Sequence, residues 1–177
     1  KPVLITMETD VGEQIVRWTA RLAVAAYVCR LTADVWSGRL LRPASTADNR
    51  NVAPTADEAQ HPGRRLVLWI WTAGCFVYLL HVAAAFHFVH SWSHVGAWRQ
   101  TAQQTADVTG WHWGGGLWIN YAFTLWWPLD AGWTWRRGLD GLPRWYVWTL
   151  HALAGFLMFN ATVVFGPAWW RWAAARR

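Results

Sequence analysis

Long stretches without charge alternate with short polar segments along this chain. Residues 66–89 and residues 147–170 each form a run of 24 residues that lacks Asp, Glu, Lys and Arg. At about 1.5 Å per residue, a helix of this length reaches about 36 Å, which exceeds a hydrocarbon core of about 30 Å. Helices buried in soluble proteins seldom lack charge over such a length. The pattern therefore predicts transmembrane helices over residues 66–89 and 147–170.

A third apolar segment covers residues 114–135. It contains one acidic residue, Asp130, and one proline, Pro128. Both residue types are tolerated in a membrane-spanning helix where they face protein rather than lipid. We therefore expect a third transmembrane helix over residues 114–135.

The segment 15–36 carries the weakest signal of the four. Its uninterrupted apolar run covers only residues 22–29, between Arg21 and Arg30, whose side chains are expected to snorkel to opposite interfaces. An amphipathic helix lying in the interface is the alternative for this segment. The acidic residues before it are atypical of the basic n-region of a cleavable signal peptide. The sequence thus predicts one all-α integral membrane domain over residues 1–177, a bundle of four transmembrane helices.

Polar segments between the apolar runs predict the orientation of the bundle. Residues 41–65 form a polar loop, and residues 98–108 form a short interfacial helix after the second span. The loops 37–65 and 136–146 share one side and hold eight arginines, against five basic residues on the other side. The positive-inside rule places both loops in the cytoplasm and both termini outside the plasma (inner) membrane, although the basic C-terminal tail argues for the reverse orientation.

Composition supports a membrane location and argues against a nucleic-acid-binding protein and a disulfide-rich secreted domain. The chain has 18 tryptophans among 177 residues, and indole rings prefer the headgroup level of a bilayer. Its net charge of +6 comes mainly from arginines scattered through loops, which favours contact with anionic lipid and excludes a nucleic-acid-binding motif. The two cysteines can form at most one bridge, so they define no disulfide framework.

Histidines gather where the second span reaches the outer surface. At about 100° per residue, a continuing helix would place His87, His90 and His94 on one face. His112, in the following loop, could fold back over the same spot. Imidazoles in this arrangement suit a transition metal or a haem, so these four histidines are candidate metal ligands. The alternative is an interfacial histidine cluster that hydrogen-bonds to loop carbonyls, water or lipid headgroups.

Polar residues within the predicted spans fall at two depths. His81, Asn120 and Asn160 lie about 8–10 Å below the outer boundary, which predicts one hydrogen-bonded layer between helices. Asp130 and His151 lie about 24 Å below that boundary, and we expect them to pair, since an intramembrane carboxylate seeks a partner. Both sets serve either to hold the helices together or to line a proton path.

Three functional hypotheses follow from these features. The first is a small multi-pass membrane subunit of a larger complex, such as a respiratory or photosynthetic electron-transfer assembly, which contributes packing or scaffold surface against lipid and other membrane subunits. The second is a membrane redox protein that binds a metal or haem through the histidine cluster. The third is a small transporter or channel. The sequence contains no complete catalytic set and leaves open whether the chain is an enzyme.

Overall fold

The computed structural model describes residues 2–38, 40 and 62–164, and every regular element in this part of the chain is helical. The all-α class is therefore confirmed for the described residues. The elements are α1 (Pro2–Trp36), α3 (Pro62–Ala84), the π-helical turn η2 (Ala85–Val89), α4 (His94–Thr109), α5 (Gly116–Arg137), the 3₁₀ turn η3 (Leu139–Gly141), α6 (Arg144–Phe159) and the π-helical turn η4 (Asn160–Val164).

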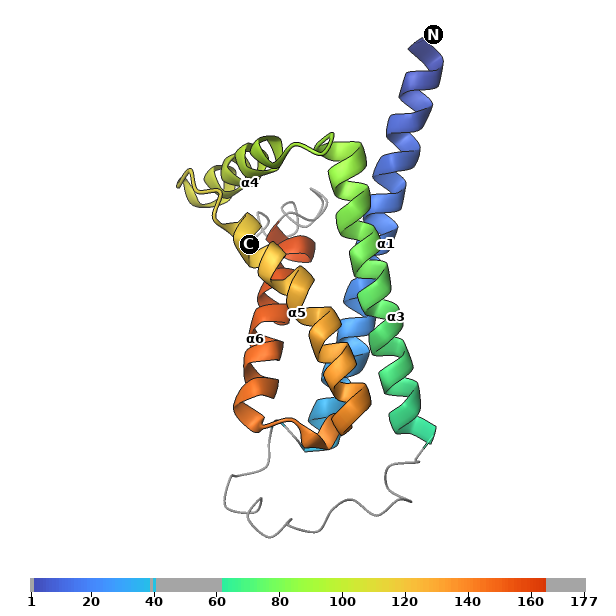
Figure 1. Ribbon diagram of the computed structural model, residues 1–177. Helices are drawn as coiled ribbons and strands as arrows, with labels where there is room; N and C mark the ends of the chain where they lie inside the picture. Colours follow the sequence, from blue (N-terminus) through green and yellow to red (C-terminus); the bar gives the residue numbers. More distant parts are fainter. Residues whose placement is uncertain (1, 39, 41–61, 165–177) are drawn as a thin grey trace, which may run out of the picture.

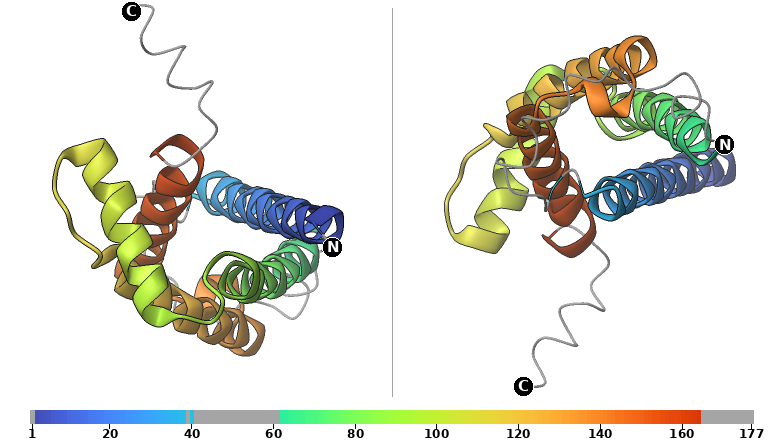
Figure 2. Two further views of the ribbon diagram at one scale, coloured as in Figure 1. Left: turned by 90° about the horizontal axis from the view of Figure 1, so that it is seen from above. Right: turned by 90° about the horizontal axis from the view of Figure 1, so that it is seen from below.

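Helices α1, α3, α5 and α6 run along the length of the molecule, and α4 lies across one end (Figure 1). Successive long helices alternate in direction, so the start of α1 and the end of α6 point toward the end that carries α4. Viewed from above, the long helices surround a common interior (Figure 2). The short helix expected after the second span is α4, and it begins at His94, earlier than the sequence indicated.

Close packing of α1 against α3 depends on a glycine. A Cβ added at Gly74 would overlap the Cβ of Ala26 and lie 3.2 Å from the ring of Trp127. Small residues at such a contact let two helix backbones approach closely. The core beside this contact is aromatic, because the rings of Trp71 and Trp127 stack with their centroids 4.5 Å apart.

The distribution of charged and apolar side chains is inverted relative to a water-soluble protein. Arg30 and Asp130 are only 1% and 0% exposed, whereas Phe76, Leu125 and Leu129 are 63%, 70% and 71% exposed. Water-soluble proteins rarely bury charges completely and rarely expose large contiguous apolar surfaces. Such an inverted distribution is typical of helices that lie in an apolar solvent.

One helical stretch among the described residues, Gly63–Val89, is long and apolar enough to cross a membrane. Only 22% of its most apolar window is buried, which is less than is typical of the core helix of a globular protein. Helices α1 and α5 are not apolar enough to pass the same test of length and hydropathy. Charged residues interrupt α1. Helix α5 is rich in tryptophan, which hydropathy scales rate as mildly polar. The structure supports one membrane-spanning candidate, and the four-span bundle stays a prediction.

Candidate functional site

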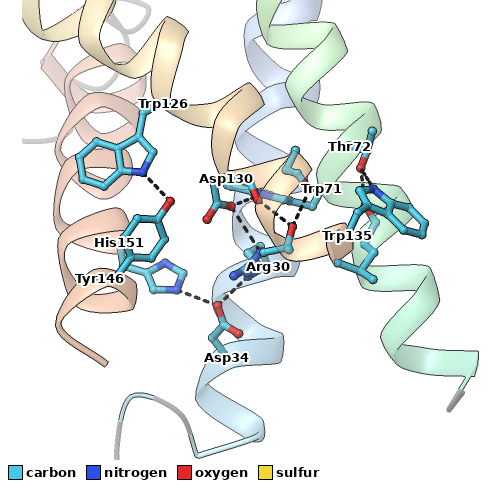
Figure 3. Close-up of polar contacts among 12 residues, drawn as sticks. Arg30, Asp34, Trp71, Thr72, Trp126, Asp130, Trp135, Tyr146 and His151 are labelled. Carbon is cyan, nitrogen blue, oxygen red and sulfur yellow. Dashed lines mark hydrogen bonds and ion pairs between the residues drawn. The ribbon is translucent and has the colours of Figure 1, made fainter. Parts of the chain in front are cut away.

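Four ionisable side chains meet inside the bundle, near the C-terminal end of α1. Arg30 and Asp34 come from successive turns of α1, Asp130 comes from α5 and His151 comes from α6 (Figure 3). Their exposed fractions are 1%, 0%, 0% and 7%. We refer to these four residues as the buried tetrad.

The guanidinium of Arg30 lies between two carboxylates from different helices. Its Nε donates to Asp34 Oδ2 at 2.7 Å, and its Nη1 lies 3.8 Å from Asp130 Oδ2. His151 Nε2 lies 3.0 Å from the same Oδ2 of Asp34. The tetrad therefore connects α1 to α5 through Arg30 and α1 to α6 through Asp34.

Aromatic residues complete the surroundings of the tetrad. Trp71 on α3 donates from Nε1 to Asp130 Oδ2 at 2.7 Å, and its ring centroid lies 5.2 Å from the guanidinium carbon of Arg30. The hydroxyl of Tyr27 donates to the carbonyl oxygen of His151 at 3.2 Å. All four long helices therefore contribute contacts to one polar centre.

Charge counting shows what this centre can do chemically. With Arg30 positive and both carboxylates negative, the tetrad carries one negative charge when His151 is neutral. One additional proton, on His151 or on a carboxylate, makes the group neutral, which is the state that a low-dielectric interior favours. Both terminal nitrogens of Arg30 and Nδ1 of His151 are buried without a hydrogen-bond partner among the described residues. The tetrad is thus suited to hold one exchangeable proton.

The partners within the tetrad differ from those expected from the sequence. We expected Asp130 to pair with His151, but the structure places His151 against Asp34, and Asp130 against Arg30 and Trp71. Arg30 was expected to snorkel to an interface and is buried instead, because two carboxylates are within reach in the interior. Sequence reasoning missed Asp34, although its spacing of four residues from Arg30 is a helical ion-pair signal.

The three polar residues expected at the shallower depth have separate partners. His81 Nδ1 lies 3.0 Å from the carbonyl oxygen of Val16 on α1. Asn160 donates to a carbonyl oxygen one turn earlier in its own helix at 2.7 Å, and Asn120 is exposed. Among the described residues these three side chains do not hydrogen-bond to one another: His81 bonds across to α1, and Asn160 bonds within its own helix.

The outer histidines lie on an interrupted helix. The π-helical turn over Ala85–Val89 changes the angular phase, and Ser91 and Trp92 then adopt positive φ values of 48° and 58°. His94 consequently begins α4 instead of extending α3. The 100° spacing that placed the three histidines on one face does not hold across this break.

Each outer histidine contacts an aromatic neighbour. His87 accepts a hydrogen bond from Trp92 Nε1 at 3.3 Å, and His94 Nδ1 lies 2.9 Å from the hydroxyl of Tyr121. Other rings pack edge-on: His90 against Phe86, with centroids 5.5 Å apart, and His112 against Trp98, with centroids 6.4 Å apart.

Metal ligation finds no support in this arrangement. Within residues 2–38, 40 and 62–164, no group of three or more His, Cys, Asp or Glu side chains could hold a metal ion. Whether His87, His90, His94 and His112 bind a metal or form an interfacial cluster stays a prediction, and their contacts in the structure are with aromatic side chains.

Several tryptophans have a role beyond the expected belts at the membrane surface. Trp126 donates from Nε1 to the hydroxyl of Tyr146 at 2.7 Å, and Trp135 donates to Thr72 Oγ1 at 2.8 Å (Figure 3). Together with Trp71, they act as hydrogen-bond donors between helices. An indole N–H that points into an apolar interior needs such a partner.

Comparison with known proteins adds no functional information. No family model, no curated protein and no solved structure matches this chain.

Proposed function

We propose that this chain is a four-span integral membrane protein. The observation that carries the proposal is the charged interior beneath an apolar surface. Helix length agrees, because α5 has 22 residues and α6 continues through η4 from Arg144 to Val164. At about 1.5 Å per residue, α5 reaches about 33 Å, enough for a hydrocarbon core of about 30 Å.

Hydroxyl groups on these helices follow the pattern expected in lipid. Where no water is available, a threonine hydroxyl donates to a carbonyl oxygen one turn earlier in its own helix. The threonines of the four proposed spans that make this bond, at 2.7 or 2.8 Å, are Thr19, Thr32, Thr72, Thr124, Thr149 and Thr162. Internal satisfaction of these donors is compatible with an apolar solvent around the spans, but Thr101, Thr105 and Thr109 of α4 make the same bond outside them, so the proposal does not rest on it.

Arginine placement supports the proposed orientation. Arg64 and Arg65 at the start of α3 line one surface together with Arg136 and Arg137 at the end of α5. Clustered arginines favour the cytoplasmic side of a membrane. In the proposed orientation this end faces the cytoplasm, and the end that carries α4 faces outward with both termini.

Within the membrane, we propose that the protein is a subunit of a larger complex, of the electron-transfer class, to which it contributes packing surface. Large aromatic side chains on the outside of α5 and α6, such as Trp118, Trp145 and Trp148, are half-exposed or more. Aromatic residues are enriched at protein interfaces. Apart from α4 and the turns of α1 that precede residue 15, the described residues offer little extramembrane surface for a catalytic domain.

Blue-native electrophoresis of membranes solubilised in a mild detergent tests this role. We expect the protein to migrate in a band far above its own mass of 20.3 kDa, together with other membrane proteins identified by mass spectrometry. Migration as a single chain under conditions that keep known complexes of the same membrane intact would contradict a subunit role.

A second candidate function is supported by the buried tetrad. A group that becomes neutral on taking up one proton, and that sits inside the membrane, suits a proton path or a proton-coupled transporter. Vesicles containing the purified protein and a trapped pH-sensitive dye test this. A proton flux that Asp130→Asn abolishes, and that the matched substitution Asp107→Asn on exposed α4 leaves unchanged, is the expected result. An absence of flux in wild-type vesicles excludes the path and leaves the tetrad a structural role.

A further inference from the structure

An open groove of about 870 Å³ runs along α5. Its floor is a stripe of apolar residues spaced three or four positions apart, namely Ala122, Leu125, Leu129 and Gly132, and Tyr146 of α6 lines one side. From Ala122 to Arg136 the stripe covers 14 residue steps, or about 21 Å. Half of a hydrocarbon core is about 15 Å, so the groove is long enough for one leaflet.

Two arginines close the cytoplasmic end of this groove. Arg136 and Arg137 occupy the last turn of α5, line the groove and are exposed. The guanidinium carbon of Arg137 lies 5.4 Å from the ring centroid of Trp133, which holds it beside the groove. In the described part of the chain, no carboxylate forms an ion pair with either arginine.

We propose that this groove binds an anionic phospholipid, with one acyl chain along the stripe and its phosphate at Arg136 and Arg137. This inference rests on the membrane placement proposed above, but not on a subunit role. An apolar channel that ends at two unpaired guanidinium groups matches the amphiphilic form of a lipid, and guanidinium binds phosphate oxygens in a bidentate manner. Basic pockets at the cytoplasmic ends of membrane helices bind anionic headgroups in this way.

Charge complementarity favours a lipid over a partner helix as the occupant. A hydrophobic helix would cover the stripe but would leave both arginines without a counter-charge at the groove end. A phospholipid satisfies both parts at once, because its glycerol phosphate lies directly above its acyl chains. The headgroup contacts give selectivity, whereas the acyl chain binds without regard to headgroup charge.

Gly132 allows the acyl-chain contact to be tested separately from the phosphate contact. Apart from the local backbone of α5, no atom beyond its chain neighbours lies within 4 Å of a Cβ built at this position, so a larger side chain has room to extend into the groove. Gly132→Leu is therefore expected to fold and to block the channel. Gly63→Leu is the matched control, because a Cβ at Gly63 also has no neighbour within 4 Å and that glycine does not line the groove.

Native mass spectrometry of the detergent-solubilised full chain measures the binding. The probes are phosphatidylglycerol and phosphatidylcholine with identical acyl chains, added in equal amounts. For the wild type we expect retention of phosphatidylglycerol to exceed that of phosphatidylcholine about 30-fold, which corresponds to about 1 kcal/mol per arginine. The variant Arg136→Gln/Arg137→Gln should lose the preference, whereas Arg21→Gln/Arg99→Gln, with the same net charge, should keep it.

Gly132→Leu should lower retention of both lipids, and Gly63→Leu should change neither. Equal retention of the two lipids by the wild type, or a preference that survives Arg136→Gln/Arg137→Gln, would overturn the proposal. Occupation of the groove by a second copy or a partner helix, seen as a dimer or a complex that Gly132→Leu disrupts without any change in lipid retention, would overturn it as well. A wild-type chain that stays in solution without detergent would instead refute the membrane placement.

Discussion

Removal of the Arg30 guanidinium is the sharpest perturbation of the buried tetrad. In Arg30→Met, Asp34 loses a charge-assisted hydrogen bond of 2.7 Å, and Asp130 loses a cation 3.8 Å away. Removing one partner of a buried ion pair typically costs about 3–5 kcal/mol. We expect the lower end of this range, about 3 kcal/mol, because His151 still lies beside Asp34.

A second substitution tests whether this cost is electrostatic. Asp130→Asn removes one negative charge and keeps an oxygen that can accept from Trp71 Nε1. The double variant Arg30→Met/Asp130→Asn then leaves Asp34 and His151 as a pair that one proton makes neutral. We expect the double variant to recover at least about 1.5 kcal/mol of the loss, a coupling typical of residues in direct contact.

Unfolding in mixed micelles measures both free energies. Near-ultraviolet circular dichroism follows the stacked rings of Trp71 and Trp127, which lie in the core next to the tetrad. If Arg30→Met unfolds within about 0.5 kcal/mol of the wild type, the range of ordinary surface substitutions, the guanidinium is not a buried counter-ion and the reasoning is wrong. If the effects of the two substitutions on the free energy of unfolding add up, the electrostatic coupling between Arg30 and Asp130 is refuted, but the cost of removing Arg30 still stands.

Three further predictions concern packing, hydrogen bonding and pH. Gly74→Val should destabilise the fold by about 1–3 kcal/mol in the same assay, since its Cβ overlaps that of Ala26. Trp71→Phe should cost about 1–3 kcal/mol because it leaves Asp130 without its 2.7 Å donor, and a cost near zero would exclude that bond. Partial burial lowers the pKa of His90, which lies outside the proposed spans, so the unfolded chain binds more protons and stability falls as the pH drops through about 6.5. Melting of the wild type and His90→Gln at about pH 5.5 and about pH 7.5 checks this, and the variant should lose part of the pH dependence.

Helix content and the short helix after the second span could be predicted from the sequence. An uncharged run such as residues 66–89 has few alternatives to a helix, because its backbone groups need internal partners wherever water is absent. The Ser93 side chain, which accepts from Gly96 N, and Gly110, with φ of 75°, then mark the ends of α4. These capping signals are local, yet the predicted start at residue 98 overlooked the N-cap at Ser93.

Contacts between helices could not be predicted in the same way. Depth counting placed Asp130 and His151 at one level, but it could not tell which residue of α1 would lie between them. The arginines of α1 were interpreted as interfacial. The sequence alone does not show whether an arginine snorkels to the membrane surface or contacts carboxylates in the interior. The pairing of His151 with Asp34 depends on helix rotation, which tertiary packing sets.

The prediction that His87, His90 and His94 share one helix face failed for a different reason. Angular arithmetic assumes an unbroken α-helix, and a single π-helical turn over Ala85–Val89 invalidates it for His90 and His94. Positive φ at Ser91 and Trp92 has no sequence signal, because neither residue is glycine. A site predicted from the angular positions of residues around a helix fails wherever such a turn interrupts the helix.

In the proposed placement lipid surrounds these helices, and a native cysteine tests this directly. Cys29 lies on α1 within the proposed first span and is exposed on the protein surface. A charged, water-soluble maleimide cannot enter hydrocarbon, so accessibility to this reagent separates lipid from water. In open membrane fragments, where both faces meet the reagent, Cys29 should stay unlabelled, whereas a cysteine introduced by Gln100→Cys on exposed α4 should react fully. Labelling of Cys29 as fast as the cysteine at position 100 would show that water, rather than lipid, covers this surface.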